Sequence, residues 1–159
     1  MSKHLERDLE ALEREILAQS SLVEEMIAKA CRGLVDRRAD LLNEVVASER
    51  TIDVREVKIE EECLKILALH QPVAVDLRSI IATLRAASDL ERIGDLAKNI
   101  AKRVVALNGN YPTPKTVHGL RSMADMALRQ LHEVLESLAL RDDAKAMSVW
   151  QGDQEIDAI

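Results

Sequence analysis

Apolar side chains recur every three or four positions along most of the chain, which is the spacing of one face of a helix. Across residues 1–35 no proline interrupts this pattern, so we predict one long helix. Gly33 and the polar run 36–40 mark its end, and Asp40 is a candidate N-cap for the next helix. The predicted core positions are Leu5, Leu9, Leu12, Ile16, Val23, Met26 or Ile27, Ala30 and Leu34.

A second helix is predicted from about Leu41 to His70. Gln71 and Pro72 end it, because proline lacks an amide hydrogen and disfavours helical geometry in the residue before it. The predicted core positions are Leu41, Val45, Ile52, Ile59, Cys63 and Ile66. At the shoulder of this stripe lie four carboxylates, Glu49, Asp53, Glu56 and Glu60, which form an acidic seam.

A third helix is predicted from about Val75 to Leu107. Its first half is expected to bury Leu77, Ile80, Ile81 and Leu84, whereas Leu90, Ile93, Ile100 and Val104 lie on nearly the opposite side. Glu91 and Asp95 continue the line of Leu77 and Leu84, so the expected core face turns acidic halfway along the helix. Because a buried carboxylate is costly unless it is paired or bound to metal, this face either reaches solvent there or holds a cation.

A cluster of Pro, Gly and Asn residues predicts a linker at 108–116 between a first unit, 1–107, and a second unit, 117–159. The second unit begins with a helix, turns at Arg141 and starts a further helix at about Ala144. A shift of 104 residues places Glu49 on Asp153 and Asp53 on Asp157, which indicates an internal repeat. Chance matching of two amphipathic helices is the alternative. If the repeat holds, the second unit lacks its third helix, and we expect it to expose an apolar face.

The composition supports an all-α protein. Leu, Ile, Val, Ala and Met supply most of the 47% hydrophobic content, and the 159 residues include no Phe, one Tyr and one Trp. A net charge of −6 argues against nonspecific binding to nucleic acid or to anionic membranes. Without an apolar run of about 18 residues, we expect no membrane insertion and a cytoplasmic location. Cys31 and Cys63 are interpreted as reduced thiols.

Acidic residues four apart form three pairs, which are Glu49/Asp53, Glu91/Asp95 and Asp153/Asp157. This spacing stacks two carboxylates on one helix face, with Cβ atoms about 5–6 Å apart. If the second and third helices form a hairpin centred on Pro72, residues whose numbers sum to 144 lie level. Asp53 is then level with Glu91, and Glu49 with Asp95. We call these the four helix carboxylates and expect them to gather in one patch.

Mutual repulsion would raise the pKa values of such a patch unless cations or open solvent relieve it. Carboxylate oxygens suit hard cations such as Mg²⁺, Mn²⁺, Ca²⁺ or ferric iron. The four histidines are scattered, so the Glu-x-x-His motif of ferritin-like di-iron sites is absent from the sequence. The alternative is a solvated acidic face that pairs with neighbours such as Arg50 and Arg92.

The segments HQPVAVDLR (70–78), DLERIGD (89–95) and NIA (99–101) resemble the PhoU phosphate-signalling proteins. The resemblance implies tandem three-helix bundles, of which the second is incomplete in this chain. It also implies a cytoplasmic negative regulator, not an enzyme, that acts between a Pst-type phosphate ABC transporter and a sensor histidine kinase. Some members bind multinuclear iron or zinc clusters through E/D-x-x-x-D motifs, which Glu49/Asp53, Glu91/Asp95 and Asp153/Asp157 match. We also expect a homo-oligomer, such as a homodimer.

The sequence contains no recognisable nucleophile–base pair, glycine-rich phosphate loop or complete metallohydrolase ligand set, which agrees with a regulator. Two functional alternatives remain open. One is a metal-free helical adaptor whose acidic seam binds a basic partner. The other is a carboxylate-bridged metalloenzyme or metal store, which would need a buried site with an open coordination position, and an exposed seam argues against it.

Overall fold

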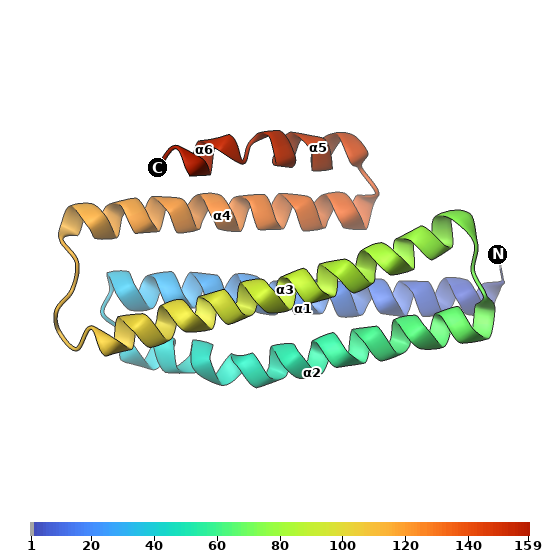
Figure 1. The fold of residues 1–159 in the computed structure, drawn as a ribbon, viewed down its shortest axis with the longest axis horizontal. Helices are drawn as coiled ribbons and strands as arrows, with labels where there is room; N and C mark the ends of the chain where they lie inside the picture. Colours follow the sequence, from blue (N-terminus) through green and yellow to red (C-terminus); the bar gives the residue numbers. More distant parts are fainter. Residues whose placement is uncertain (1) are drawn as a thin grey trace. The chain divides into compact units, whose positions relative to one another are not determined.

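The computed structural model describes residues 2–159, and within that range the secondary structure is entirely helical. The six helices are α1 (Lys3–Val35), α2 (Ala39–His70), α3 (Ala74–Ala106), α4 (Pro114–Leu140), α5 (Asp143–Gln151) and α6 (Gln154–Asp157) (Figure 1). The predicted all-α class is therefore confirmed. Each long helix begins and ends within a few residues of its predicted bounds. Among the described residues, no helix combines the length and apolar character needed to cross a membrane.

The chain divides by contact into two compact units. The first comprises the described residues up to Val23 together with Ser48–Asp95, and the second comprises Glu24–Ala47 and Leu96–Ile159. Helices α1, α2 and α3 thus contribute residues to both units. This division differs from the predicted boundary at 108–116, which remains a prediction about domains.

The first unit packs segments of three helices around an aliphatic core. An ion pair between Lys58 Nζ and Glu15 Oε1, at 2.8 Å, joins α2 to α1. The side chain of Gln19 on α1 donates a hydrogen bond from Nε2 to the backbone oxygen of Ala87 on α3, at 3.2 Å. These contacts place all three segments side by side. The buried apolar residues are Leu5, Leu12, Ile16, Val23, Ile52, Ile59, Cys63, Ile66, Ile80, Ala87 and Leu90.

The second unit has its own core, and its last two helices run back along α4. Its buried apolar residues are Met26, Ala30, Leu34, Leu42, Val45, Ala97, Ala101, Val104 and Leu135. Helix α4 begins at a cap in which the Thr113 hydroxyl accepts a hydrogen bond from the Thr116 amide. It ends at Arg141, which has left-handed geometry, and α5 and α6 then run back along α4 (Figure 1). The turn predicted at Arg141 is therefore confirmed.

Close packing near the end of α1 explains why a glycine stands there. A Cβ atom built on Gly33 would lie 2.5 Å from Cδ2 of Leu42, which is a buried side chain. Leu42 takes the core position that the sequence pattern assigned to Leu41, which is half-buried. The predicted N-cap at Asp40 is also wrong, because α2 already begins at Ala39, and Asp40 instead pairs with Arg38.

The buried face of α3 differs from the predicted one. Apart from Lys98, the buried positions of α3 are 80, 83, 87, 90, 94, 97, 101 and 104, which form one straight stripe with alternating steps of three and four. Leu77 and Ile81, which were predicted to be buried, are 39% and 40% exposed. The true stripe contains Thr, Ala and Gly residues, whereas the prediction followed the bulky aliphatic side chains. The core face therefore does not turn acidic midway.

Candidate functional site

The helical hairpin that the sequence predicted for the four helix carboxylates is present. Helix α2 ends at His70 and α3 begins at Ala74, so the connection is centred on Pro72, as expected. Glu49 and Asp53 lie within α2, and Glu91 and Asp95 lie within α3, all in the first unit. The pairs 53/91 and 49/95 are therefore equally distant along the chain from the hairpin connection.

These four carboxylates differ in exposure. Asp53 is exposed, whereas Glu49, Glu91 and Asp95 are half-buried. Glu49 follows the buried Val45 by four positions and precedes the buried Ile52 by three. It therefore lies on the same face of α2 as these core residues, which explains its intermediate exposure. Each of the three half-buried carboxylates takes part in a hydrogen bond, ion pair or other electrostatic interaction. These groups are therefore integrated into the polar contacts of the protein.

The donor arrangement does not form a ready-made metal site. Nowhere in residues 2–159 do three or more His, Cys, Asp or Glu side chains lie in a group that could hold one metal ion. Ligation by the four helix carboxylates would therefore require their side chains to turn toward a common point. Metal binding at these residues remains a prediction.

The third acidic pair has a different local structure from the first two. Helix α5 ends at Gln151, and Gly152 and Asp153 separate it from the short helix α6, which begins at Gln154. Asp153 and Asp157 are exposed, and the Asp157 amide donates to the Asp153 carbonyl at 3.3 Å, so the two remain one helical turn apart. Unlike Glu49 and Asp53, this pair does not lie within a long helix. It belongs to the second unit.

Basic side chains near the predicted site have specific partners. Arg92, an expected partner of the acidic face, pairs with Asp89 at 3.8 Å, and both side chains are exposed. Arg55 and Lys58 on α2 both pair with Glu15 of α1, which the sequence had not singled out. The exposed pair of Arg92 and Asp89 contributes little to stability, whereas Glu15 and Arg55 are half-buried and join α1 to α2.

Sequence reasoning also missed Lys98, which is only 8% exposed. A lysine is almost never buried unless its charge is compensated, and Lys98 does take part in a polar or electrostatic interaction. The sequence feature that could have indicated its burial is that Lys98 directly follows Ala97, a residue of the buried stripe of α3. Because the predicted stripe followed larger aliphatic residues, Lys98 was assigned to no face.

Two further contacts in the first unit connect ionisable groups. His70 Nε2 lies 2.9 Å from Asp8 Oδ2, which joins the end of α2 to the start of α1. This hydrogen bond is the largest of the causes that lower the pKa of Asp8 below its usual value. Burial raises the pKa of the Cys63 thiol to about 11, so this cysteine is a poor nucleophile and a poor metal ligand at neutral pH. Both cysteines are free thiols, as predicted.

Comparison with known proteins gives one consistent result. The family model described as "PhoU domain" matches residues 16–104. A phosphate-specific transport system accessory protein PhoU homolog of Rhizobium meliloti is 42% identical, and the match covers 97% of this chain and 65% of the relative. The corresponding homolog of Deinococcus radiodurans is 37% identical, with 100% of this chain and 74% of the relative covered.

Solved structures agree with the sequence relatives. The crystal structure of PhoU from Pseudomonas aeruginosa superimposes with a TM-score of 0.91 at 34% identity, covering 96% of this chain and 73% of that one. The phosphate transport system regulatory protein PhoU from Streptococcus pneumoniae gives a TM-score of 0.89 at 31% identity, with 97% and 72% covered. This chain therefore spans about two thirds to three quarters of the relatives named here. It belongs to the PhoU family.

Proposed function

We propose that this chain is an accessory regulator of a phosphate transport system, in which it acts as a negative regulator of phosphate uptake and of phosphate-starvation signalling. Its partners would be a Pst-type phosphate ABC transporter and a sensor histidine kinase. The observation that carries the proposal is family membership over nearly the whole chain. The net charge of −6 also favours protein partners over nucleic acid or anionic lipid.

The four helix carboxylates are the proposed contact surface. Glu49, Glu91 and Asp95 are half-buried side chains on two long helices, so their positions are constrained by packing rather than by a flexible loop. A surface of this kind can present negative charge to a basic partner with little loss of side-chain entropy. In the proposed mechanism these carboxylates recognise the transporter or the kinase, and no group of the chain performs a chemical step.

The proposal is tested by binding to the purified transporter. The chain is titrated onto an immobilised, detergent-solubilised Pst-type transporter, and its dissociation constant is compared with that of a Glu91→Gln/Asp95→Asn variant. The control variant is Glu6→Gln/Glu10→Gln, which removes an exposed acidic pair of the same spacing from α1. We expect the first variant to weaken binding at least tenfold and the control to change it less than twofold. Equal effects of the two variants would remove the proposed contact surface, and no binding of the wild-type chain would refute the transporter as a direct partner.

Metal dependence separates this proposal into its two forms. In one form the acidic pairs hold a multinuclear iron or zinc site, or Mg²⁺, Mn²⁺ or Ca²⁺, and in the other the protein is a metal-free adaptor. Elemental analysis of the purified protein decides between them, with the same variant and control. Metal that is lost in the Glu91→Gln/Asp95→Asn variant and retained in the control supports ligation. Partner binding that persists in chelator and weakens with salt supports the adaptor.

A further inference from the structure

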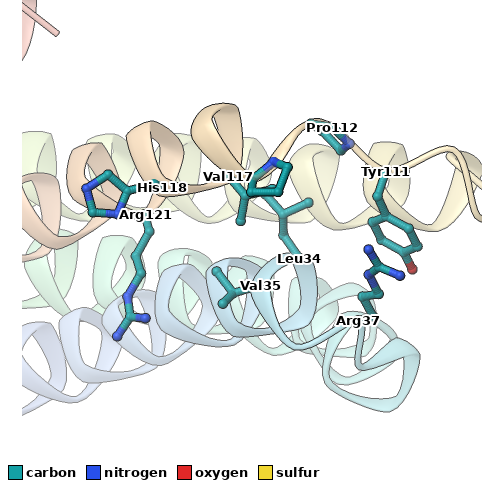
Figure 2. Close-up of a pocket in the computed structure, with 9 residues that line it drawn as sticks. Leu34, Val35, Arg37, Tyr111, Pro112, Val117, His118 and Arg121 are labelled. Carbon is teal, nitrogen blue, oxygen red and sulfur yellow. The ribbon is translucent and has the colours of Figure 1, made fainter.

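A pocket of about 320 Å³ is lined only by residues of the second unit (Figure 2). The four helix carboxylates belong to the first unit. The pocket is lined by the end of α1, by Arg37 of the turn that follows, by the segment before α4 and by the first turns of α4. Its volume lies at the lower end of the range for small-molecule sites, about 300–1,000 Å³. The pocket is therefore large enough for a small ligand.

The side chains lining this pocket that can carry charge near neutral pH are all basic. Arg37, His118 and Arg121 line it, and no carboxylate does so, although acidic residues outnumber basic ones in the chain by 28 to 22. Asp36 and Asp125 stand close to these residues in the sequence, but neither lines the pocket. The basic groups that line the cavity therefore favour an anion over a cation.

The two pocket arginines have no carboxylate partner. Among the described residues, neither Arg37 nor Arg121 comes within ion-pair distance of an Asp or Glu, whereas the adjacent Arg38 makes a two-pronged contact with Asp40, whose Oδ1 is 2.8 Å from Nε. A guanidinium carries five N–H donors arranged to grip a carboxylate or a phosphate. Arg37 and Arg121 therefore retain donors for a ligand.

Arg37 is held in place by an aromatic side chain. Its guanidinium carbon lies 4.6 Å from the centroid of the Tyr111 ring, within the range of a cation–π interaction. The backbone of Arg37 has φ +54°, a left-handed geometry that is uncommon for a residue with a side chain. Stacking on a ring fixes the plane of a guanidinium but leaves the N–H groups at its edge free to donate. The ring thus positions Arg37 without consuming its donors.

Figure 2 shows how charge and apolar surface are distributed in the pocket. Arg37 and Tyr111 lie toward one end, and His118 and Arg121 lie toward the other. Between the ends stand apolar side chains of α1 and α4, namely Leu34, Val35 and Val117. The pocket therefore offers hydrogen-bond donors at its ends and aliphatic surface in the middle.

We propose that this pocket binds a small organic anion, in which a carboxylate or phosphate group is attached to an apolar body. The anionic group is bound by the guanidinium groups of Arg37 or Arg121, and the apolar body packs on Leu34, Val35 and Val117. An inorganic anion would satisfy the arginines but leave the aliphatic surface uncovered. The proposed ligand site and the proposed partner surface thus use different residues.

The test uses Tyr111, the single tyrosine of the chain, as a reporter inside the pocket. Phenyl phosphate, benzoate and inorganic phosphate are titrated separately onto the full chain, and the tyrosine ring signals are followed by NMR. We expect saturable shifts with phenyl phosphate or benzoate, and at least tenfold weaker binding of inorganic phosphate. Tyr111 signals that do not move with either organic anion would overturn the proposal, and equal binding of inorganic phosphate would overturn the role of the apolar body.

Charge variants provide the matched comparison. At least one of Arg37→Gln and Arg121→Gln, whichever removes the arginine that binds the anionic group, is expected to raise the dissociation constant of the organic anion at least fivefold. Arg38→Gln, which removes the neighbouring arginine that already has a carboxylate partner, should change it less than twofold. Thermal unfolding of each variant confirms that it is folded. Equal weakening by all three substitutions would show a general charge effect and refute the assignment of Arg37 and Arg121.

Discussion

Gln19 provides the sharpest test of how the first unit is held together. Gln19 lies on α1, and its side chain is completely buried against α3. Its Nε2 donates a hydrogen bond to the backbone carbonyl of Ala87 at 3.2 Å. Its Oε1 accepts no hydrogen bond from the described residues. Turning the amide over would not help, because Oε1 would then face the carbonyl oxygen of Ala87. One polar atom of this side chain is unsatisfied in either orientation.

Replacing Gln19 with Met should therefore stabilise the protein. Removing an unsatisfied buried polar atom gains about 1–3 kcal/mol, and losing the bond to Ala87 costs about 0.5–1.5 kcal/mol. The carbonyl of Ala87 keeps its own helical hydrogen bond in α3, so the substitution leaves no new unsatisfied group. Met is unbranched, like Gln, and adapts to an irregular space. The expected net gain in the free energy of unfolding is about 1 kcal/mol.

Thermal and urea unfolding followed by circular dichroism measure this change. For a chain of this size, about 1 kcal/mol corresponds to a rise in Tm of about 2–4 °C. Gln154→Met, at an exposed position of α6, is the control and should lie within about 0.5 kcal/mol of the wild type. A loss of about 1 kcal/mol or more in Gln19→Met, with a neutral control, would refute the reasoning, because it would mean that Oε1 is satisfied in solution.

Three further predictions concern packing and ionisation. Gly33→Ala should lower the Tm by about 2–4 °C, because the clash with Leu42 costs about 1–3 kcal/mol and the higher helix propensity of Ala returns about 1 kcal/mol. The hydrogen bond from Arg38 lowers the pKa of Asp40 from 3.8 to about 2. The pair therefore stabilises the folded state above about pH 3.8, and this stabilisation is lost as the pH falls toward 2. Carboxyl ¹³C NMR should show the Asp40 midpoint returning toward 3.8 in Arg38→Gln; an unchanged midpoint would exclude Arg38 as the cause. Cys63, with its pKa of about 11, should resist alkylation at pH 8 until the protein unfolds, and rapid labelling of the native protein would contradict its burial.

Local signals in the sequence were sufficient for the helices. The Gln71–Pro72 break and the Arg141 turn predicted where elements end, because proline geometry and the reversal of a periodic pattern act within a few residues. The core of α1 was predicted nearly completely, since its stripe consists of large aliphatic side chains. The motif around Glu91 and Asp95 was also enough to indicate the family.

Only the tertiary structure decided which face of α3 is buried. Thr83, Ala87 and Gly94 lie on the core stripe, while the larger Leu77 and Ile81 are partly exposed. Hydrophobicity alone ranks Leu and Ile above Ala and Gly, but side chains of both sizes, such as Ile80 and Ala87, lie on the buried stripe. Which residues of α3 are buried depends on where the neighbouring helices pack, which no local pattern encodes.

The same limit applies to the functional features. Arg37 and Tyr111 stand 74 positions apart, and nothing in either local pattern indicated that they meet in one pocket. Sequence spacing did place the four helix carboxylates on the two helices of one hairpin, at equal numbers of residues from its connection, because proline ends α2 and a short connection joins it to α3. How their side chains turn, and which arginines keep a free guanidinium, depends on the particular neighbours that folding places beside each group.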